Sequence, residues 1–271
     1  MYVLPATPLP IGGVIDNALR LFRYSFKRGW PLALAAAAIG SIYELAALAN
    51  LPGYHLWSLF RADEIARITS VSGSPRFRGL QLLIFLAVLP LQGGLLAFQA
   101  AVARGDRSFT LRTALALGIR RFPTLLLASL LYVLAWLVGI VAFVIPGLYL
   151  FVALQLYEPL ILVENMGPLK ALRSSARLVS GGWWRASAIL TVGAVIVLVF
   201  DVTLSLLGEL LSGLIRAGTA ERAVVIELLD LPATTVGYAL GTAVLFAMYY
   251  DFRLRKEGLD LSARIETLGQ V

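Results

Sequence analysis

Three acidic residues interrupt long apolar stretches of this chain, and their carboxyl groups have the greatest capacity for chemistry. They are Glu44, Glu158 and Asp201. A carboxylate at the centre of a bilayer costs about 2.5–3.5 kcal/mol on insertion scales. None of the predicted apolar spans contains a Lys or Arg, so these acids are either protonated or in contact with water.

Two interpretations of these acids remain open. In the first, Glu44 and Asp201, predicted at similar depth, line a polar cavity that binds a cation, a proton or a lipid head group. In the second, each carboxyl group bonds a Ser, Thr, Tyr or backbone carbonyl of a neighbouring helix and has a structural role.

The composition excludes several classes of function. The 271 residues are 59% hydrophobic and 14% charged, whereas soluble domains average about 45–50% and about 25%. Without Cys, and with His55 as the only His, the chain offers no disulfide, thiol nucleophile or multi-His metal site. We expect no catalytic residue, metal or cofactor. The net charge of +7 is typical of basic segments beside a membrane, so we expect no nucleic-acid partner.

The elements that must position these acids are membrane spans, because about 20 apolar residues cross a hydrocarbon core about 30 Å thick. The third and fourth spans form one apolar run that must fold back, and Pro146-Gly147 is its turn signal. The sequence predicts an all-α, polytopic membrane helix bundle as a single domain over residues 1–271. Its six transmembrane helices lie at about 30–51, 79–103, 122–145, 146–163, 186–207 and 232–250.

The distribution of basic residues predicts the orientation. With both termini on one side, that side carries 17 Lys and Arg residues and the opposite side carries six. The positive-inside rule therefore places residues 1–29 and 251–271 in the cytoplasm.

Amphipathic basic segments precede three of the spans. Residues 14–26, 111–122 and 169–179 are such segments, and helices of this kind can lie in the cytoplasmic membrane interface. In or beside each segment, an Ala-Leu pair precedes an aromatic residue at the start of the next span, and the pairs of positions are Ala18 and Trp30, Ala114 and Phe122, and Ala171 and Trp183. Two interpretations stay open: a three-fold repeat of interfacial helix plus two-span hairpin, or unrelated juxtamembrane helices that look alike.

Two stretches resemble a known family. Residues 146–185 contain a Pro-Gly turn and a Glu-Asn-x-Gly step, and residues 249–261 read YYDFRLRKEGLDL. Together they resemble the membrane-domain family of glycerophosphoryl diester phosphodiesterase, which includes free-standing bacterial inner-membrane proteins. The resemblance implies an inner-membrane protein without the catalytic domain, because that domain uses paired histidines that this chain lacks.

Charged residues in and beside these stretches form a second candidate set. Their positions indicate either a cytoplasmic polar cluster that gates or docks a partner, or helix-end charge balance with lipid anchoring. They are Glu164, Arg173, Arg177, Asp251, Arg253, Arg255 and Glu257.

These observations favour a non-catalytic membrane protein that binds, translocates or organises phospholipid or another amphiphile. The expected partners are membrane lipids, including anionic phospholipid, and a second copy of the chain or another membrane protein. A proton- or ion-coupled small-molecule exporter is one alternative, and a membrane scaffold or assembly partner is another.

Overall fold

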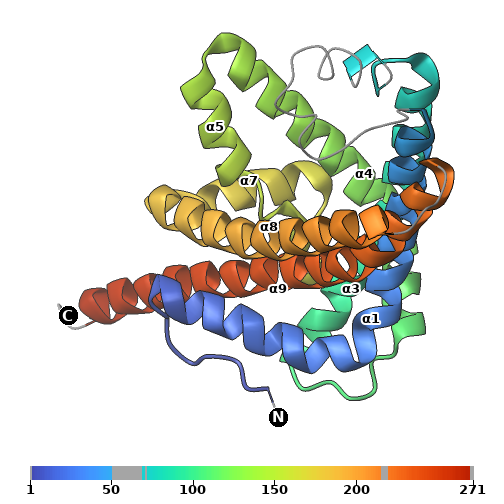
Figure 1. The fold of residues 1–271 in the computed structure, drawn as a ribbon. Helices are drawn as coiled ribbons and strands as arrows, with labels where there is room; N and C mark the ends of the chain where they lie inside the picture. The colour runs from blue at the N-terminus through green and yellow to red at the C-terminus, as the bar shows by residue number, and fades with distance from the viewer. Residues whose placement is uncertain (1, 51–68, 71, 215–218, 269–271) are drawn as a thin grey trace.

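The computed structural model describes residues 2–50, 69–70, 72–214 and 219–268 (Figure 1). The main elements of these ranges are helices, as predicted. Their bounds are α1 Ile11–Asn50, α3 Pro75–Ala103, α4 Leu111–Ala142, α5 Val144–Ala153, α6 Tyr157–Val163, α7 Pro168–Val179, α8 Trp183–Leu214 and α9 Thr219–Leu268. His55 lies outside the described residues.

Six helical segments of the described ranges are long and apolar enough to cross a membrane. This confirms the predicted number and order of candidate spans. All six begin earlier than predicted. Their bounds are Ile11–Ala47, Pro75–Ala103, Leu111–Ala142, Val144–Val163, Trp183–Gly208 and Val224–Lys256.

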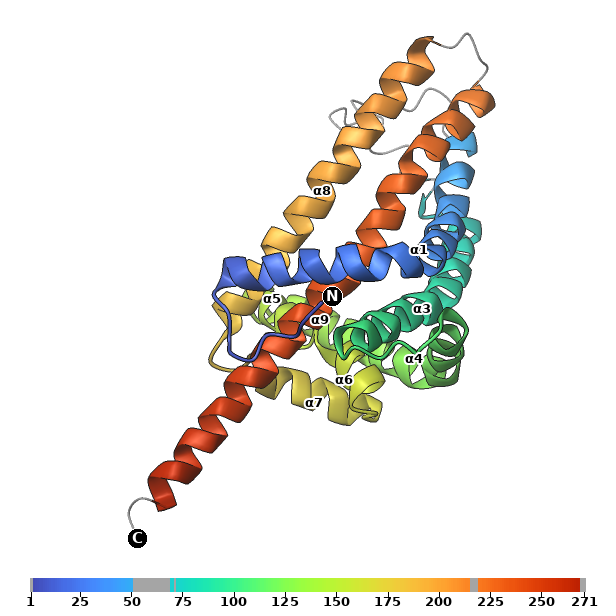
Figure 2. The same ribbon diagram turned by 90° about the horizontal axis from the view of Figure 1, so that it is seen from below.

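The predicted boundary between interfacial segment and span is absent from two helices. α1 runs without interruption through Pro31, and α4 runs through Pro123. α1 bends part-way along its length (Figures 1 and 2), and Pro31 near its midpoint supplies a cause because proline removes a backbone hydrogen bond. The third segment forms a separate helix, α7. It ends at Val179 and is followed by the capping residue Ser180 and by Gly181 with φ +79°.

The fold-back between the third and fourth spans is present, but it lies three residues before the predicted Pro146-Gly147 turn. α4 ends at Ala142, and Phe143 adopts an extended backbone before α5 begins. Pro146 and Gly147 instead occupy the first turn of α5, where proline's missing N–H is tolerated. A Cβ on Gly139 would lie 2.8 Å from the Cα of Gly147, so the glycines allow α4 and α5 to pack closely.

α9 packs against α1, α3 and α8. α1 packs against α3, α3 against α4, and α4 against α5, which in turn contacts α8. α3 and α4 are in backbone contact, because a Cβ on Gly118 would lie 2.1 Å from the Pro90 carbonyl oxygen. Small residues at such crossings are typical of membrane helix packing. Figure 2 shows the C-terminal end of α9 projecting from the bundle.

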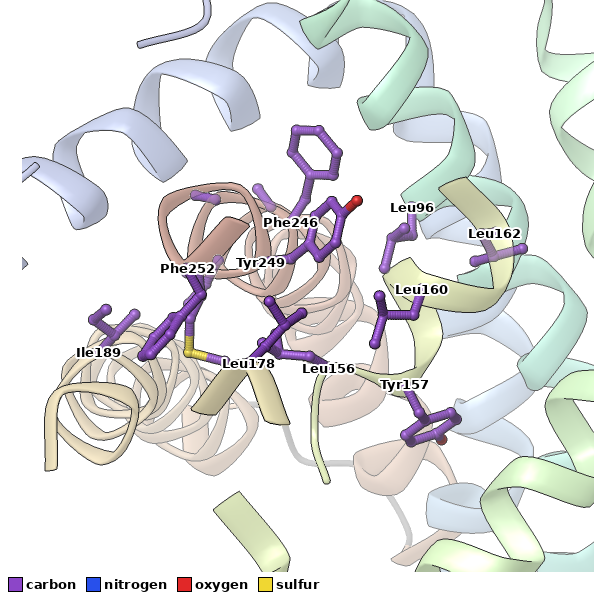
Figure 3. Packing of buried hydrophobic residues seen from close by; sticks show 14 of the residues in the cluster. Leu96, Leu156, Tyr157, Leu160, Leu162, Leu178, Ile189, Phe246, Tyr249 and Phe252 are labelled. Carbon is purple, nitrogen blue, oxygen red and sulfur yellow. The ribbon is translucent and has the colours of Figure 1, made fainter. Parts of the chain in front are cut away.

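The buried core lies where α6 and α7 meet α3, α8 and α9 (Figure 3). Leu160 of α6 and Met248 of α9 are fully buried there. By contrast, α4, α5 and α8 expose many large apolar side chains, including Val141, Ile145 and Leu198. An exposed apolar surface of this kind suits contact with lipid.

Candidate functional site

The fourth span is not one continuous helix, which is the feature on which the candidate site is built. Residues 154–156 form turns between α5 and α6. The buried Ser175 of α7 bridges this break: its hydroxyl accepts from the Leu156 N–H at 3.0 Å and donates to the Ala153 carbonyl at 2.8 Å. Non-helical backbone at membrane depth is tolerated where protein groups satisfy it or where it borders a cavity.

A chain of polar side chains surrounds the break. The Tyr132 hydroxyl donates to Oε1 of Gln155 at 2.8 Å, and the Tyr157 hydroxyl donates to Oε1 of Glu158 at 3.2 Å. Tyr157 also lies 3.0 Å from the Ser129 hydroxyl. The network thus holds an amide and a carboxyl group beside the α5–α6 break.

Gln155 and Glu158 open onto a cavity of about 790 Å³ between α3, the α5–α6 break, α8 and α9. Its lining includes the polar residues Gln92, Gln155, Glu158, Asp201, Tyr238 and Thr242. Val195 and Leu198 of α8 also line it and are 49% and 58% exposed, so the cavity reaches the apolar outer surface. Its volume lies in the range of about 300–1,000 Å³ that is usual for small-molecule sites.

The cavity brings together a different pair of acids from the one predicted. Asp201 shares it with Glu158, whereas Glu44 is exposed on α1 and is not among the lining residues that the structure describes. Glu44 still interacts electrostatically with Asp201 and with Tyr238, which lines the cavity. The three predicted acids therefore belong to one region, with Glu158 inside it and Glu44 at its margin.

Sequence reasoning missed two further acids of this region. Glu227, which is buried, and Asp230 interact electrostatically with Glu44, and Asp230 accepts from the Ser205 hydroxyl at 3.0 Å. The prediction began the last span at Pro232 and left both acids in an outer loop. α9 instead passes through that proline. No three acids or histidines among the described residues lie close enough to hold a metal ion.

A second polar cluster surrounds the buried Asp251, which is 3% exposed. Arg185 of α8 pairs with its Oδ2 at 2.9 Å, and Arg255, one turn along α9, pairs with the same oxygen at 3.0 Å. The Leu9 N–H donates to Oδ1 at 2.9 Å, while both arginines donate to the Leu9 carbonyl. The cluster therefore fixes the N-terminal segment to α8 and α9.

The same N-terminal segment is held by Tyr2, whose hydroxyl donates to Oδ1 of Asn17 at 2.8 Å. Burial raises the pKa of Tyr2 to about 12. Its hydroxyl therefore stays protonated, and able to donate, throughout the neutral range.

The other predicted cytoplasmic residues that the structure describes lie outside the Asp251 cluster. Glu164 accepts from the Tyr249 hydroxyl at 2.6 Å and pairs with Arg253 at 3.5 Å. Arg173 and Arg177 lie exposed on α7, where Arg177 donates to Ser174. The side chain of Glu257 lies outside the described part of the chain. Arg185 was not among the predicted candidates, and it supplies the ion pair between α8 and Asp251.

Comparisons with known proteins agree with the membrane architecture. A family model described as "Domain of unknown function (DUF7847)" matches residues 132–252, just under half of the chain. This range contains the α5–α6 break, Asp201, and the Arg185 and Asp251 members of the second cluster, whereas Leu9 and Arg255 lie outside it.

Curated relatives carry the name "UPF0259 membrane protein". Those from Yersinia pestis (strain Pestoides F) and Yersinia pseudotuberculosis serotype O:3 (strain YPIII) are each 34% identical over 88 residues, which is 32% of this chain and 34% of theirs. The chain thus spans about a third of their length. No solved structure shows significant similarity.

The protein is a multi-pass membrane protein. Six candidate spans and similarity to membrane proteins support this conclusion. The relatives found belong to an uncharacterised membrane family, so the resemblance to the membrane domain of glycerophosphoryl diester phosphodiesterase stays a prediction.

Proposed function

We propose that this protein binds a phospholipid or another amphiphile within the membrane and translocates or organises it without catalysing a reaction. The observation that carries the proposal is the cavity beside the α5–α6 break, which combines polar lining residues with access to the apolar surface of the bundle. An amphiphile needs both environments, since its head group must be solvated by polar groups while its chain stays in contact with apolar ones.

The exposed basic face of α7 supports the same proposal. Lys170, Arg173 and Arg177 are exposed there, while Leu172 and Val179 face the core. In the orientation we propose, both termini are in the cytoplasm of a bacterium, and α7 contacts anionic head groups at the inner leaflet of its inner membrane. Resemblance to the membrane part of a lipid-metabolising enzyme also favours a lipid as ligand.

A second candidate function is a proton- or ion-coupled exporter. It is favoured by the electrostatic coupling of Glu44, Asp201 and Asp230 at the margin of the cavity. For this function, Asp201→Asn would abolish pH-dependent transport while leaving the lipids bound to the protein unchanged. The proposed amphiphile function predicts that the bound lipids change as well.

The decisive experiment is mass spectrometry of lipids retained by the full chain in native nanodiscs, compared with the bulk membrane. The wild type should be enriched in one lipid class. Gly241 lines the cavity, and a Cβ added there meets no atom within 4 Å. Gly241→Leu should therefore occupy the cavity without disturbing the fold and remove the enrichment.

Gly79 supplies a matched control. It is a helical glycine outside the cavity lining, and a Cβ there also meets nothing within 4 Å. Gly79→Leu should retain the wild-type lipids. A bulk-like lipid profile in the wild type, or equal enrichment in both variants, would refute amphiphile binding at this cavity.

A further inference from the structure

We infer that the cavity takes amphiphiles whose head group carries a positive charge, either a protonated amine or a quaternary ammonium. This inference rests on the proposed function and specifies the class of ligand. Its basis is the juxtaposition of two carboxyl groups from different helices, Glu158 on α6 and Asp201 on α8, in one cavity.

The charge of the cavity lining favours a cationic head group. None of the lining residues that the structure describes is a Lys or Arg. Within hydrogen-bonding distance, Glu158 has the Tyr157 hydroxyl as a neutral partner. Carboxylates in a poorly solvated site are stabilised by an opposite charge and destabilise a like one. The cavity therefore favours a cationic head group over a phosphate or a carboxylate.

Further acidic side chains lie near the cavity. Asp201 interacts electrostatically with Glu44 and Glu227, which both also interact with Asp230. These acids extend the acidic region from the cavity along α1, α8 and α9. A bound cation stabilises the ionised form of such carboxyl groups and is attracted by it, whereas an anion is repelled by it.

The hydrogen-bonding groups of the cavity lining also suit a cationic head group. An ammonium group donates and does not accept, and the cavity offers carboxyl and amide oxygens as acceptors from Gln92, Gln155, Glu158 and Asp201. For a quaternary ammonium, which donates no N–H bond, the carboxylates supply the attraction. Tyr238 also lines the cavity, and its ring is of the type that contacts quaternary ammonium groups through cation–π interactions.

An apolar hollow next to the cavity offers a place for an alkyl chain. A second hollow of about 520 Å³, formed by α1, α8 and α9, is lined almost wholly by apolar side chains such as Phe22 and Leu204. Val195, Val197 and Gly237 line both hollows, so the two adjoin at the α8–α9 contact. A molecule with its cationic head beside Glu158 would place its chain against this apolar hollow.

The inference is tested with the full chain in dodecyl maltoside micelles. The probe is radiolabelled dodecyltrimethylammonium, competed by dodecyl phosphate, dodecanol and tetramethylammonium. We expect the wild type to bind the probe at least tenfold more tightly than dodecyl phosphate or dodecanol. Tetramethylammonium, which has the charge and no chain, should compete at least tenfold less well than the unlabelled probe.

Variants then assign the charge preference to the cavity. Glu158→Gln and Asp201→Asn keep the size of the side chain and should each weaken probe binding at least tenfold. Gly241→Leu should abolish probe binding, and Gly79→Leu should leave it unchanged. The competition in the wild type tests the preference even if a charge variant fails to fold.

The outcomes separate this inference from the proposed function. Equal affinity for dodecyltrimethylammonium and dodecyl phosphate would overturn the cationic preference, while lipid loss in Gly241→Leu nanodiscs would still support amphiphile binding. Equal competition by tetramethylammonium would show a site for free organic cations and overturn the requirement for a chain. Absence of lipid enrichment in nanodiscs would refute the proposed function itself.

Discussion

Replacing Asp251 with Asn should weaken the attachment of the N-terminal segment and lower the stability of the whole bundle. In the wild type, the carboxylate accepts from two arginines and from the Leu9 N–H. Asn keeps an acceptor for Leu9 but loses the negative charge. Arg185 and Arg255 would then remain near the Leu9 carbonyl without an anionic partner in the cluster.

The magnitude follows from the exposure of each partner. A hydrogen bond to a charged group contributes about 1.5–3 kcal/mol, and the pair with Arg185, which is 19% exposed, belongs in that range. The pair with Arg255 joins residues i and i+4, and Arg255 is 35% exposed, so solvent reduces its contribution to about 0.5 kcal/mol. We expect Asp251→Asn to lower the free energy of unfolding by about 2–3.5 kcal/mol.

The assay is thermal unfolding of the purified protein in detergent, followed by tryptophan fluorescence. At about 2–4 °C per kcal/mol for a chain of roughly this size, the Tm should fall by about 4–14 °C. Arg185→Gln should lower the Tm more than Arg255→Gln. Hydrogen exchange of residues 2–10 should accelerate in Asp251→Asn, because these residues are held through Leu9.

Asp16→Asn is the control, since Asp16 is an exposed acid on α1 and its replacement should leave the Tm unchanged. Equal Tm values for Asp251→Asn and Asp16→Asn would refute the expected loss of stability. Unchanged exchange of residues 2–10 would refute the attachment of the N-terminal segment even if the Tm falls.

Three further predictions concern the scaffold and the topology. Ser175→Ala should destabilise the bundle by about 1–3 kcal/mol, seen as a lower Tm, because it leaves the backbone groups at the α5–α6 break without a partner; a wild-type Tm would contradict this. Gly118→Ala should abolish monodisperse elution in size-exclusion chromatography, because its Cβ would overlap the Pro90 carbonyl, whereas Gly79→Ala should elute normally. A reporter fused after Val271 should behave as cytoplasmic, and a periplasmic signal would overturn the proposed orientation.

The sequence by itself determined the class of the protein. Apolar stretches long enough for a bilayer predicted six helical spans, and the described part of the chain contains six such helical segments. The positions of Glu44, Glu158 and Asp201 within apolar stretches also made them candidate site residues, because a carboxyl group in a membrane span is energetically costly. Proline and turn residues in the sequence predicted the ends of the helices less well. Proline inside a membrane helix need not end it when neighbouring groups satisfy the backbone, and α9 passes through Pro232.

Only the tertiary structure decided which side chains meet. It placed Asp201 with Glu158, chose Arg185 from α8 as partner of Asp251, and set the break at residues 154–156 beside Ser175. The physical reason is that lipid is as apolar as a helix interface. Hydrophobic periodicity therefore does not tell the face of a span that packs on another helix from the face that contacts lipid, and pairings between distant segments become visible only once the helices are assembled.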